Sequence, residues 1–128
     1  MTQKLEIYKC SICGNIIEVT HASVGELVCC GQPMQLMQEN TVDASTEKHI
    51  PVIEDALNGM MVKIGAVPHP MEASHYIEWV EVITDKKVYC EYLELNGSPF
   101  CFFPINKSEV VSVRAYCNLH GLWQNKLQ

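Results

Sequence analysis

Hydrophobic residues recur along the chain in short runs that are typical of β-strands. From residue 50 onward, six runs rich in β-branched and aromatic residues are separated by turn signals: PVIEDA, MMVKIGAV, HYIEWVEVIT, KKVYCEYLEL, SPFCFFPI and EVVSVRAYC, the last of which ends the series. Asn58-Gly59, Asp85-Lys86 and Asn96-Gly97 lie between successive runs, and Asn-Gly favours a tight hairpin. No apolar stripe of helical period has useful length. Residues 49–128 are therefore predicted to form an antiparallel β-sandwich of about seven strands.

The first 37 residues differ from the rest of the chain. Their strand-like pieces are shorter (LEIYK, NIIEVT, GELVCC and MQLM), and glycines punctuate them. A unit of this size buries too little apolar surface to fold alone, so a metal or a partner must stabilise it. The polar segment QENTVDASTEK, residues 38–48, is predicted to be a linker. We therefore expect an all-β chain with a small domain over 1–37 and a sandwich domain over 49–128.

Composition excludes several classes of function. The chain has 128 residues, 48% of them hydrophobic and 19% charged, which is typical of a globular protein. The net charge of −6 argues against nucleic acid as a partner, because phosphate binding needs a basic face. No apolar run is long enough to span a membrane. The N-terminal MTQKLEIYKC has no hydrophobic signal core, so a cytoplasmic protein is expected.

The seven cysteines point to metal binding. Without an export signal, cysteines are better interpreted as metal ligands than as a disulfide framework. Four of them fall in the first domain: Cys10, Cys13, Cys29 and Cys30. The Cys10-x2-Cys13 spacing lets one turn present two thiolates to one ion, and the adjacent Cys29 and Cys30 would complete a distorted tetrahedron. A site with four sulfurs takes zinc or iron, and the spacing does not decide between them.

The histidines of the second domain have unusual sequence contexts. His69 lies in PHP, where the flanking prolines favour a stiff extended backbone, and His49 precedes Pro51 by two residues. His75 can share an ion with His69 only if HPMEASH doubles back. Cys117-x2-His120 is a second chelate spacing, followed by Gly121. His21, in VTHASVG, is interpreted as a solvated loop residue.

Ligand counting then suggests a metal. His49, His69, His75, His120 and Cys117 make five donors, which is more than a structural zinc takes. Five donors with a sixth position open suit an iron that binds a small molecule. Four neutral imidazoles and one thiolate on Fe(II) leave a charge near +1, which attracts a small anion.

Five motifs, in order along the chain, closely resemble the desulfoferrodoxin family, the two-iron form of superoxide reductase: YKCSICGN, ELVCCG, TEKHIPVIE, PHPMEASHYIEW and YCNLHG. The resemblance implies a desulforedoxin-like domain followed by a seven-stranded immunoglobulin-like sandwich. It also implies two iron ions per chain and no organic cofactor. An Fe(Cys)4 centre would use Cys10, Cys13, Cys29 and Cys30. An Fe(His)4(Cys) centre would take His49, His69, His75 and His120 in its plane and Cys117 on its axis.

The same resemblance implies the activity and the partners. Superoxide would be reduced by one electron to hydrogen peroxide, a detoxification under oxidative stress. Lys48 would attract the anion and position a water that supplies protons, and Glu47 would bind the oxidised iron. A rubredoxin-like or other reductase protein would donate the electron, the Fe(Cys)4 centre would be of electron-transfer type, and the protein would be a homodimer.

Two other functions stay open on the residues alone. A rubredoxin-type electron carrier fused to a non-catalytic sandwich needs only the first four cysteines and one iron. A zinc-stabilised binding module would contain zinc and no iron. Cys90 and Cys101, outside the ligand sets, are expected in two strands of one hairpin as buried free thiols, in a register that does not favour a disulfide.

Overall fold

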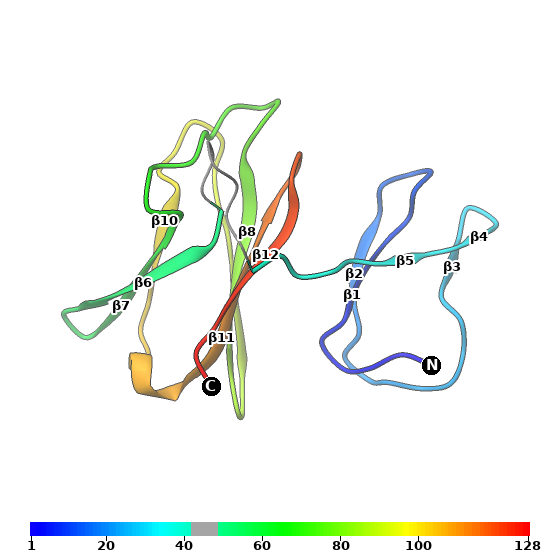
Figure 1. The fold of residues 1–128 in the computed structure, drawn as a ribbon, viewed down its shortest axis with the longest axis horizontal. Coiled ribbons are helices and arrows are strands. Elements are labelled where there is room, and N and C mark those ends of the chain that lie inside the picture. The colour runs from blue at the N-terminus through cyan, green and yellow to red at the C-terminus, as the bar shows by residue number, and fades with distance from the viewer. Residues whose placement is uncertain (42–48) are drawn as a thin grey trace. The chain divides into compact units, whose positions relative to one another are not determined.

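A computed structural model describes residues 1–41 and 49–128. The chain forms two compact units, Met1–Gln38 and Glu39–Gln128, and Figure 1 labels most of their elements. Apart from one short 3-10 helix, η1 (Lys107–Glu109), the elements of the described ranges are strands. Within these ranges no helix has the length and apolar character needed to cross a bilayer. The prediction of an all-β protein is confirmed.

The first unit contains short strands with little core. They are β1 (Ile7–Lys9), β2 (Ile16–Glu18), β3 (Val28–Cys29), β4 (Gln32–Pro33) and β5 (Gln35–Leu36). β1 is the central strand of a sheet with the order β2-β1-β5, and β3 and β4 form a separate hairpin. Ile7 and Val19 are buried apolar residues here, whereas Ile12, Val24 and Val28 are exposed. The small number of buried apolar residues is the reason to expect that this unit needs its cysteine cluster for stability.

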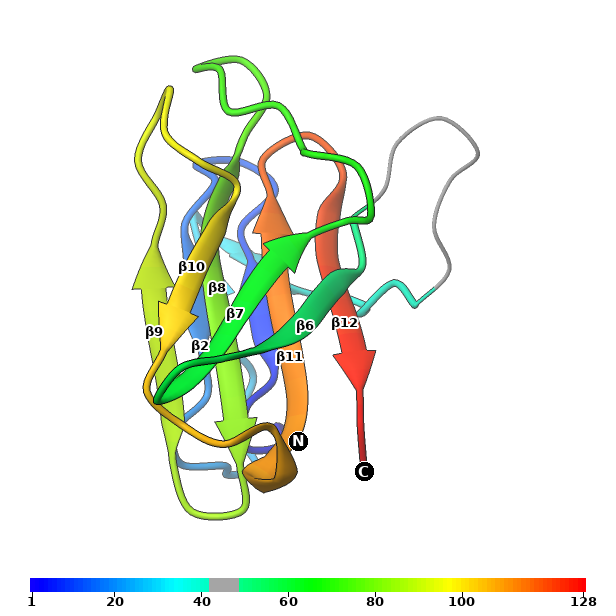
Figure 2. The same ribbon diagram turned by 90° about the vertical axis from the view of Figure 1, so that its left-hand side faces the viewer.

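The second unit is a sandwich of two antiparallel sheets (Figure 2). Its strands are β6 (Pro51–Ala56), β7 (Gly59–Ile64), β8 (Ile77–Thr84), β9 (Val88–Tyr92), β10 (Phe100–Phe103), β11 (Val110–Cys117) and β12 (Gly121–Lys126). One sheet has the order β10-β7-β6 and the other β12-β11-β8-β9. Side chains from both sheets form one core, including Val62, Val80, Val113 and Phe103. These strands make up the predicted seven-stranded sandwich.

The first hairpin of the sandwich turns one residue earlier than the sequence suggests. Ala56 pairs with Gly59, so Leu57 and Asn58 are the turn residues and Gly59 begins β7. Asn58 adopts φ of 62°, a conformation that asparagine tolerates. A Cβ atom at Gly59 would overlap the carbonyl oxygen of Phe103 on the neighbouring strand β10. Gly59 is therefore required by close strand packing, whereas Asn58 makes the turn.

Strand β12 and residue Asn40 differ from what the sequence suggests. β12 was not among the predicted runs, because half of the positions in GLWQNK are polar and none is β-branched. Asn40, in the predicted linker, belongs to the second unit, since its N–H donates to the Leu122 carbonyl at 2.9 Å and its own carbonyl accepts from Gln124.

The expectation that Cys90 and Cys101 lie in one hairpin is wrong. β9 pairs with β8 and β10 pairs with β7, so the two thiols belong to different sheets. After β9 the chain crosses to the other sheet through residues 93–99, where Asn96 has φ of 61°. Cys101 packs against the core, but Cys90 is exposed, so only one of the two thiols is shielded.

The register of the strands brings four strand ends together at one end of the sandwich. Pro51 at the start of β6 pairs with Ile64 at the end of β7, and Ile77 at the start of β8 pairs with Cys117 at the end of β11. The segment 65–76 and the turn between β11 and β12 therefore emerge side by side (Figure 2). His69, His75 and His120 lie in these connections, and His49 lies two residues before the start of β6.

Candidate metal centres

The end of the sandwich gathers five potential ligands. One donor atom from each residue lies within 4.8 Å of the others, in a group formed by His49, His69, His75, Cys117 and His120. His49 lies two residues before β6, and the next two histidines lie between β7 and β8. Cys117 ends β11, and His120 lies in the β11–β12 turn. Three separate segments thus converge, as the strand register requires.

The four imidazoles are arranged as a square. Neighbouring ring centroids around the group are 4.6, 4.6, 5.0 and 4.8 Å apart, in the order His49, His69, His75, His120 and back to His49. The rings of His49 and His75, across the group, are 6.3 Å apart. A tetrahedral set would have equal separations, whereas the diagonal of a square is about 1.4 times its side. The measured diagonal exceeds every side, so the ring centroids approach a square more closely than a tetrahedron.

The donor-to-donor distances fit a metal ion. Nδ1 of His120 lies 3.1 Å from Nε2 of His49. Two nitrogens bound at about 2.1 Å on perpendicular axes would be about 3.0 Å apart. The Cys117 Sγ atom lies 3.6 Å from His69 Nε2 and 3.8 Å from His120 Nδ1, close enough to be an axial donor. Cys117, His49 and His69 are buried, whereas His120 is exposed, so the group reaches solvent on one side.

The segment that carries His69 and His75 doubles back. Glu72 and His75 exchange two backbone hydrogen bonds, of 3.0 and 2.9 Å. The Nδ1 atom of His69 lies 2.7 Å from the carbonyl oxygen of Pro70, which can only accept a hydrogen bond. His69 Nδ1 therefore carries the proton, and its Nε2 is available as a ligand. The stiff PHP backbone aims this imidazole inward, as the sequence suggests.

Two residues around this group had no signal in the sequence. The Asn118 side chain accepts the Tyr76 N–H at 2.8 Å and donates to the Ser74 carbonyl at 3.2 Å, so it holds both peptides that flank His75. Trp123 stacks on the His49 ring. Asn118 lies inside the YCNLHG motif, but neither residue is a metal-ligand type, and a single sequence does not mark them.

The first unit brings its four cysteines together. Their sulfur atoms lie within 4.8 Å of one another, and the Sγ atoms of Cys13 and Cys29 are 3.6 Å apart. Sulfurs bound tetrahedrally at about 2.3 Å would be about 3.8 Å apart. Cys30 and Gly31 are the two residues of the β3–β4 turn, with φ of 53° and 73°. This left-handed turn lets two adjacent cysteines face the same ion.

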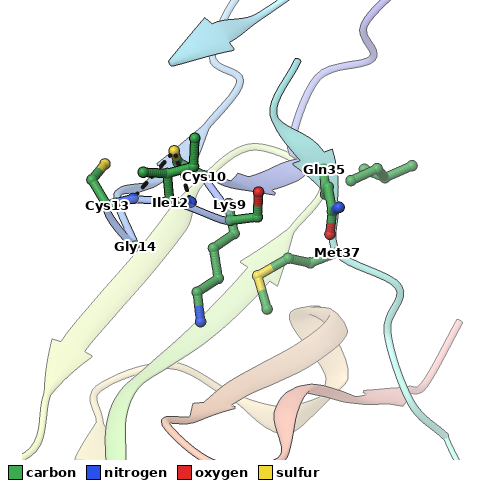
Figure 3. Close-up of a pocket in the computed structure, with 9 residues that line it drawn as sticks. Lys9, Cys10, Ile12, Cys13, Gly14, Gln35 and Met37 are labelled. Carbon is green, nitrogen blue, oxygen red and sulfur yellow. Dashed lines mark hydrogen bonds between the residues drawn. The ribbon is translucent and has the colours of Figure 1, made fainter. Parts of the chain in front are cut away.

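Backbone N–H groups surround the Cys10 sulfur. Ile12 and Cys13 donate to Sγ of Cys10 at 3.4 and 3.5 Å (Figure 3). These N–H groups, that of Cys13 foremost, lower the pKa of Cys10 to about 6. The neighbouring sulfurs, that of Cys13 first, raise the pKa of Cys30 to about 12. A bound cation would offset this repulsion between the thiolates. The group is therefore suited to a cation and is poorly suited to four uncoordinated thiolates.

A hollow of about 580 Å³ lies beside this cysteine group. Lys9, Ile12, Gln35 and Met37 line it together with Cys10 and Cys13, as Figure 3 shows. Ile12 is 57% exposed and Cys13 is exposed. The cysteine group therefore lies close to the surface, where the distance to an external redox partner is short.

Three other residues were named from the sequence, His21, Glu47 and Lys48. His21 is exposed and belongs to neither cysteine nor histidine group, in agreement with its interpretation as a loop residue. Glu47 and Lys48 lie outside the described residues.

Comparisons with known proteins match the whole arrangement. The family model described as desulfoferrodoxin matches residues 41–126, and that of the desulfoferrodoxin N-terminal domain matches residues 2–37. A desulfoferrodoxin from Syntrophotalea carbinolica is 53% identical over 98% of this chain and 99% of its own. A desulfoferrodoxin homolog from Archaeoglobus fulgidus is 54% identical over 98% of this chain and 99% of its own.

A solved structure has the same fold. The superoxide reductase from Treponema pallidum superposes with a TM-score of 0.79 and 31% identity, covering 98% of this chain and 100% of its own. Both family models thus match the two units in which the cysteine and histidine groups occur, and the curated relatives match them nearly end to end. With both ligand groups assembled and both halves matched, the chain belongs to the desulfoferrodoxin family.

Proposed function

We propose that this protein is a superoxide reductase with two iron centres, one at each ligand group. The observation that carries the proposal is the square of four imidazoles with a buried thiolate beside it. Five donors leave one position of a six-coordinate ion for a substrate. The Treponema pallidum protein of the same fold is a superoxide reductase.

The proposed ligand residues have different roles. Cys117, which is fully buried, would hold the ion through its thiolate, and this donor would raise the electron density at the metal. His49, His69, His75 and His120 would hold the ion through four imidazole nitrogens, which with the thiolate make a set larger than the three or four protein ligands that zinc usually takes. The exposed side at His120 admits a small anion from solvent. Bound iron(II) supplies the electron and the open coordination position.

The net reaction is the reduction of superoxide by one electron and two protons to hydrogen peroxide. Each turnover consumes an electron, so an external donor must reset the centre. The cysteine group, with four sulfur ligands and no open position, suits electron transfer, and its place near the surface favours entry from a rubredoxin-like or other reductase protein. We also propose a cytoplasmic homodimer that detoxifies superoxide under oxidative stress.

Two further roles rest on the sequence alone. Lys48 precedes His49 directly and supplies positive charge next to the ligand plane in a chain of net charge −6. We propose that it attracts superoxide and positions a water for proton delivery. Glu47 is proposed as the ligand that binds the centre after oxidation.

Metal content and product stoichiometry test the proposal. The wild type should contain two iron ions per chain, and superoxide consumption with a reductant should yield one peroxide per superoxide. A dismutase yields one peroxide per two superoxide ions, so that ratio would contradict a reductase. Cys117→Ser should lose most of the activity. One iron ion per chain would instead support the rubredoxin-type electron carrier. Zinc without iron would support the zinc-stabilised binding module.

The role of the cysteine centre is tested separately. Cys10→Ser removes one of its ligands and leaves the histidine group intact. If this centre passes electrons to the other, turnover with a protein donor should fall while the direct reaction of the reduced protein with superoxide is unchanged. Unchanged turnover with the protein donor would reject the relay.

A further inference from the structure

Trp123 contacts two residues of the histidine group that come from distant parts of the sequence. Its indole ring stacks on the imidazole of His49, with centroids 4.6 Å apart and planes 14° from parallel. Its Nε1–H donates to the backbone carbonyl of His120 at 3.1 Å. Trp123 is 7% exposed and lies in β12, opposite Ala115 of β11. The side chain is therefore fixed by the sheet on one side and touches the group on the other.

The stacking contact defines the plane of the His49 ring. The two neighbouring imidazoles, His69 and His120, meet that ring edge-on, at 64° and 69°. The indole face covers one side of the imidazole, so a swing of the ring would lose the stacking contact. A swing about the Cβ–Cγ bond would move Nε2 out of the plane of the four nitrogens. The indole thus fixes the torsion on which the direction of that nitrogen depends.

The hydrogen bond defines the backbone at His120. This residue faces the group with Nδ1, the nitrogen nearer to the main chain. A ligand that uses Nδ1 has a short reach, so a small backbone shift moves the donor atom by almost the same amount. Gly121, with φ of 84°, follows directly and lets the chain reverse. The bond from Trp123 anchors this turn, in which Cys117 also lies.

We infer that Trp123 is a positioning residue of the five-ligand centre, which holds the His49 plane and the His120 main chain in ligating geometry. The inference rests on the proposed iron site and adds to it a residue outside the ligand set. Outer-shell partners of this kind commonly change metal affinity by about 10–100-fold when they are removed. Stacking and hydrogen bonding can be separated, because phenylalanine keeps an aromatic face but has no N–H group.

The chain offers a matched control and a built-in reporter. It contains two tryptophans, and the other, Trp79, stacks on Tyr116 and not on a histidine. In Trp79→Phe, Trp123 becomes the single indole and lies against a ligand. Adding ferrous iron anaerobically to the metal-free Trp79→Phe protein should quench its fluorescence, and the Trp123→Phe protein, which keeps Trp79, should be quenched far less.

Iron release to a chelator is the decisive measurement, with the oxidised thiolate-to-iron absorption band recorded on the same samples. We expect release from the histidine centre to be about 10-fold faster in Trp123→Phe and up to about 100-fold faster in Trp123→Leu, with a shifted band. Trp79→Phe should match the wild type. Thermal unfolding of the metal-free proteins shows whether Trp123→Leu folds. If Trp123→Leu does not fold, the release rate of Trp123→Phe alone tests the positioning role.

The outcomes separate this inference from the proposed function. Wild-type release rates and an unshifted band in both Trp123 variants would overturn the positioning role alone. A wild type that binds iron tightly but does not consume superoxide would overturn the proposed activity and leave the positioning role intact. A wild type that takes up no iron at the histidine group would overturn both, before any variant is compared.

Discussion

The Oδ1 atom of Asn118 accepts a hydrogen bond from the backbone N–H of Tyr76 at 2.8 Å. The same side chain donates to Ser74, so it grips the chain on both sides of His75. Asn118 itself follows Cys117 in sequence. Asn118 therefore links the segments of two proposed ligands, Cys117 through its backbone and His75 through its amide side chain.

Asn118→Ala removes both of these bonds and should loosen His75. Iron should leave the histidine centre about 10-fold faster, since the ligand is no longer held in place. Chelator-driven release followed by absorption measures this rate, and the cysteine centre should be unaffected. Asn106→Ala is the matched control, because Asn106 caps the distant helix η1; it should cost about 1 kcal/mol of stability without affecting iron. Equal rates of iron release from Asn118→Ala and Asn106→Ala would contradict the role of Asn118 in holding His75.

The buried ion pair of Glu81 and Arg114 should matter far more to stability than the exposed pair of Glu54 and Lys63. The Arg114 Nε atom donates to Glu81 at 2.8 Å, and both side chains are at most 5% exposed. Arg114→Met leaves a buried carboxylate without its partner, so we expect a loss of about 3–5 kcal/mol in the free energy of unfolding.

Lys63→Met, in a pair whose side chains are about half exposed, should cost under about 1 kcal/mol. Chemical denaturation of the two variants measures both losses. Similar losses would mean that the burial of Arg114 does not determine its contribution.

The two thiols outside the ligand sets should differ in reactivity. Burial, with the nearby Glu91 carboxylate, raises the pKa of Cys101 to about 12, so at pH 8 almost none of it is thiolate, the reactive form. Cys90 is exposed. In the iron-loaded protein an alkylating reagent should label Cys90 first, and labelling of Cys101 should rise only toward pH 12 or on unfolding. Mass spectrometry of peptides after timed labelling tests this, and preferential labelling of Cys101 at pH 8 would contradict it.

Lys48→Ala should slow the reaction with superoxide at low ionic strength. If Lys48 attracts the anion, its removal weakens the local positive field, and added salt should then slow the variant less than the wild type. Pulse radiolysis across a range of salt concentrations gives both rates. Lys63→Ala, an exposed lysine in β7, is the charge-matched control. Parallel salt dependence in wild type and Lys48→Ala would reject steering by this residue.

The sequence predicted the sandwich well because its strands repeat apolar residues at a short period. β8 and β11, each eight residues long and rich in valine, coincide with the predicted runs. β12 was missed because its pairing with β11, and not its own composition, makes it a strand. Likewise the position of the first turn depends on Gly59. A side chain at this position would overlap Phe103, which lies on a strand distant in sequence.

The ligand candidates were visible in sequence as residue types beside prolines and glycines. What the sequence could not supply was the convergence of His49, His69 and Cys117, which follows from the strand register. The contacts of Asn118 and Trp123 depend on the same register and on side-chain direction, so no local sequence pattern predicts them. The error on Cys90 and Cys101 has the same origin, since consecutive strands were assumed to pair within one sheet.

The nitrogens of His49 and His120 that lie 3.1 Å apart belong to residues 71 positions apart in the chain. An ion held by both would act as a crosslink that closes nearly the whole second unit into a loop. Such a closure restricts the unfolded chain and so favours the folded one, as a long-loop disulfide does. Unfolding of the sandwich would then be coupled to loss of its ion, so the free energy of unfolding would rise with the concentration of free iron.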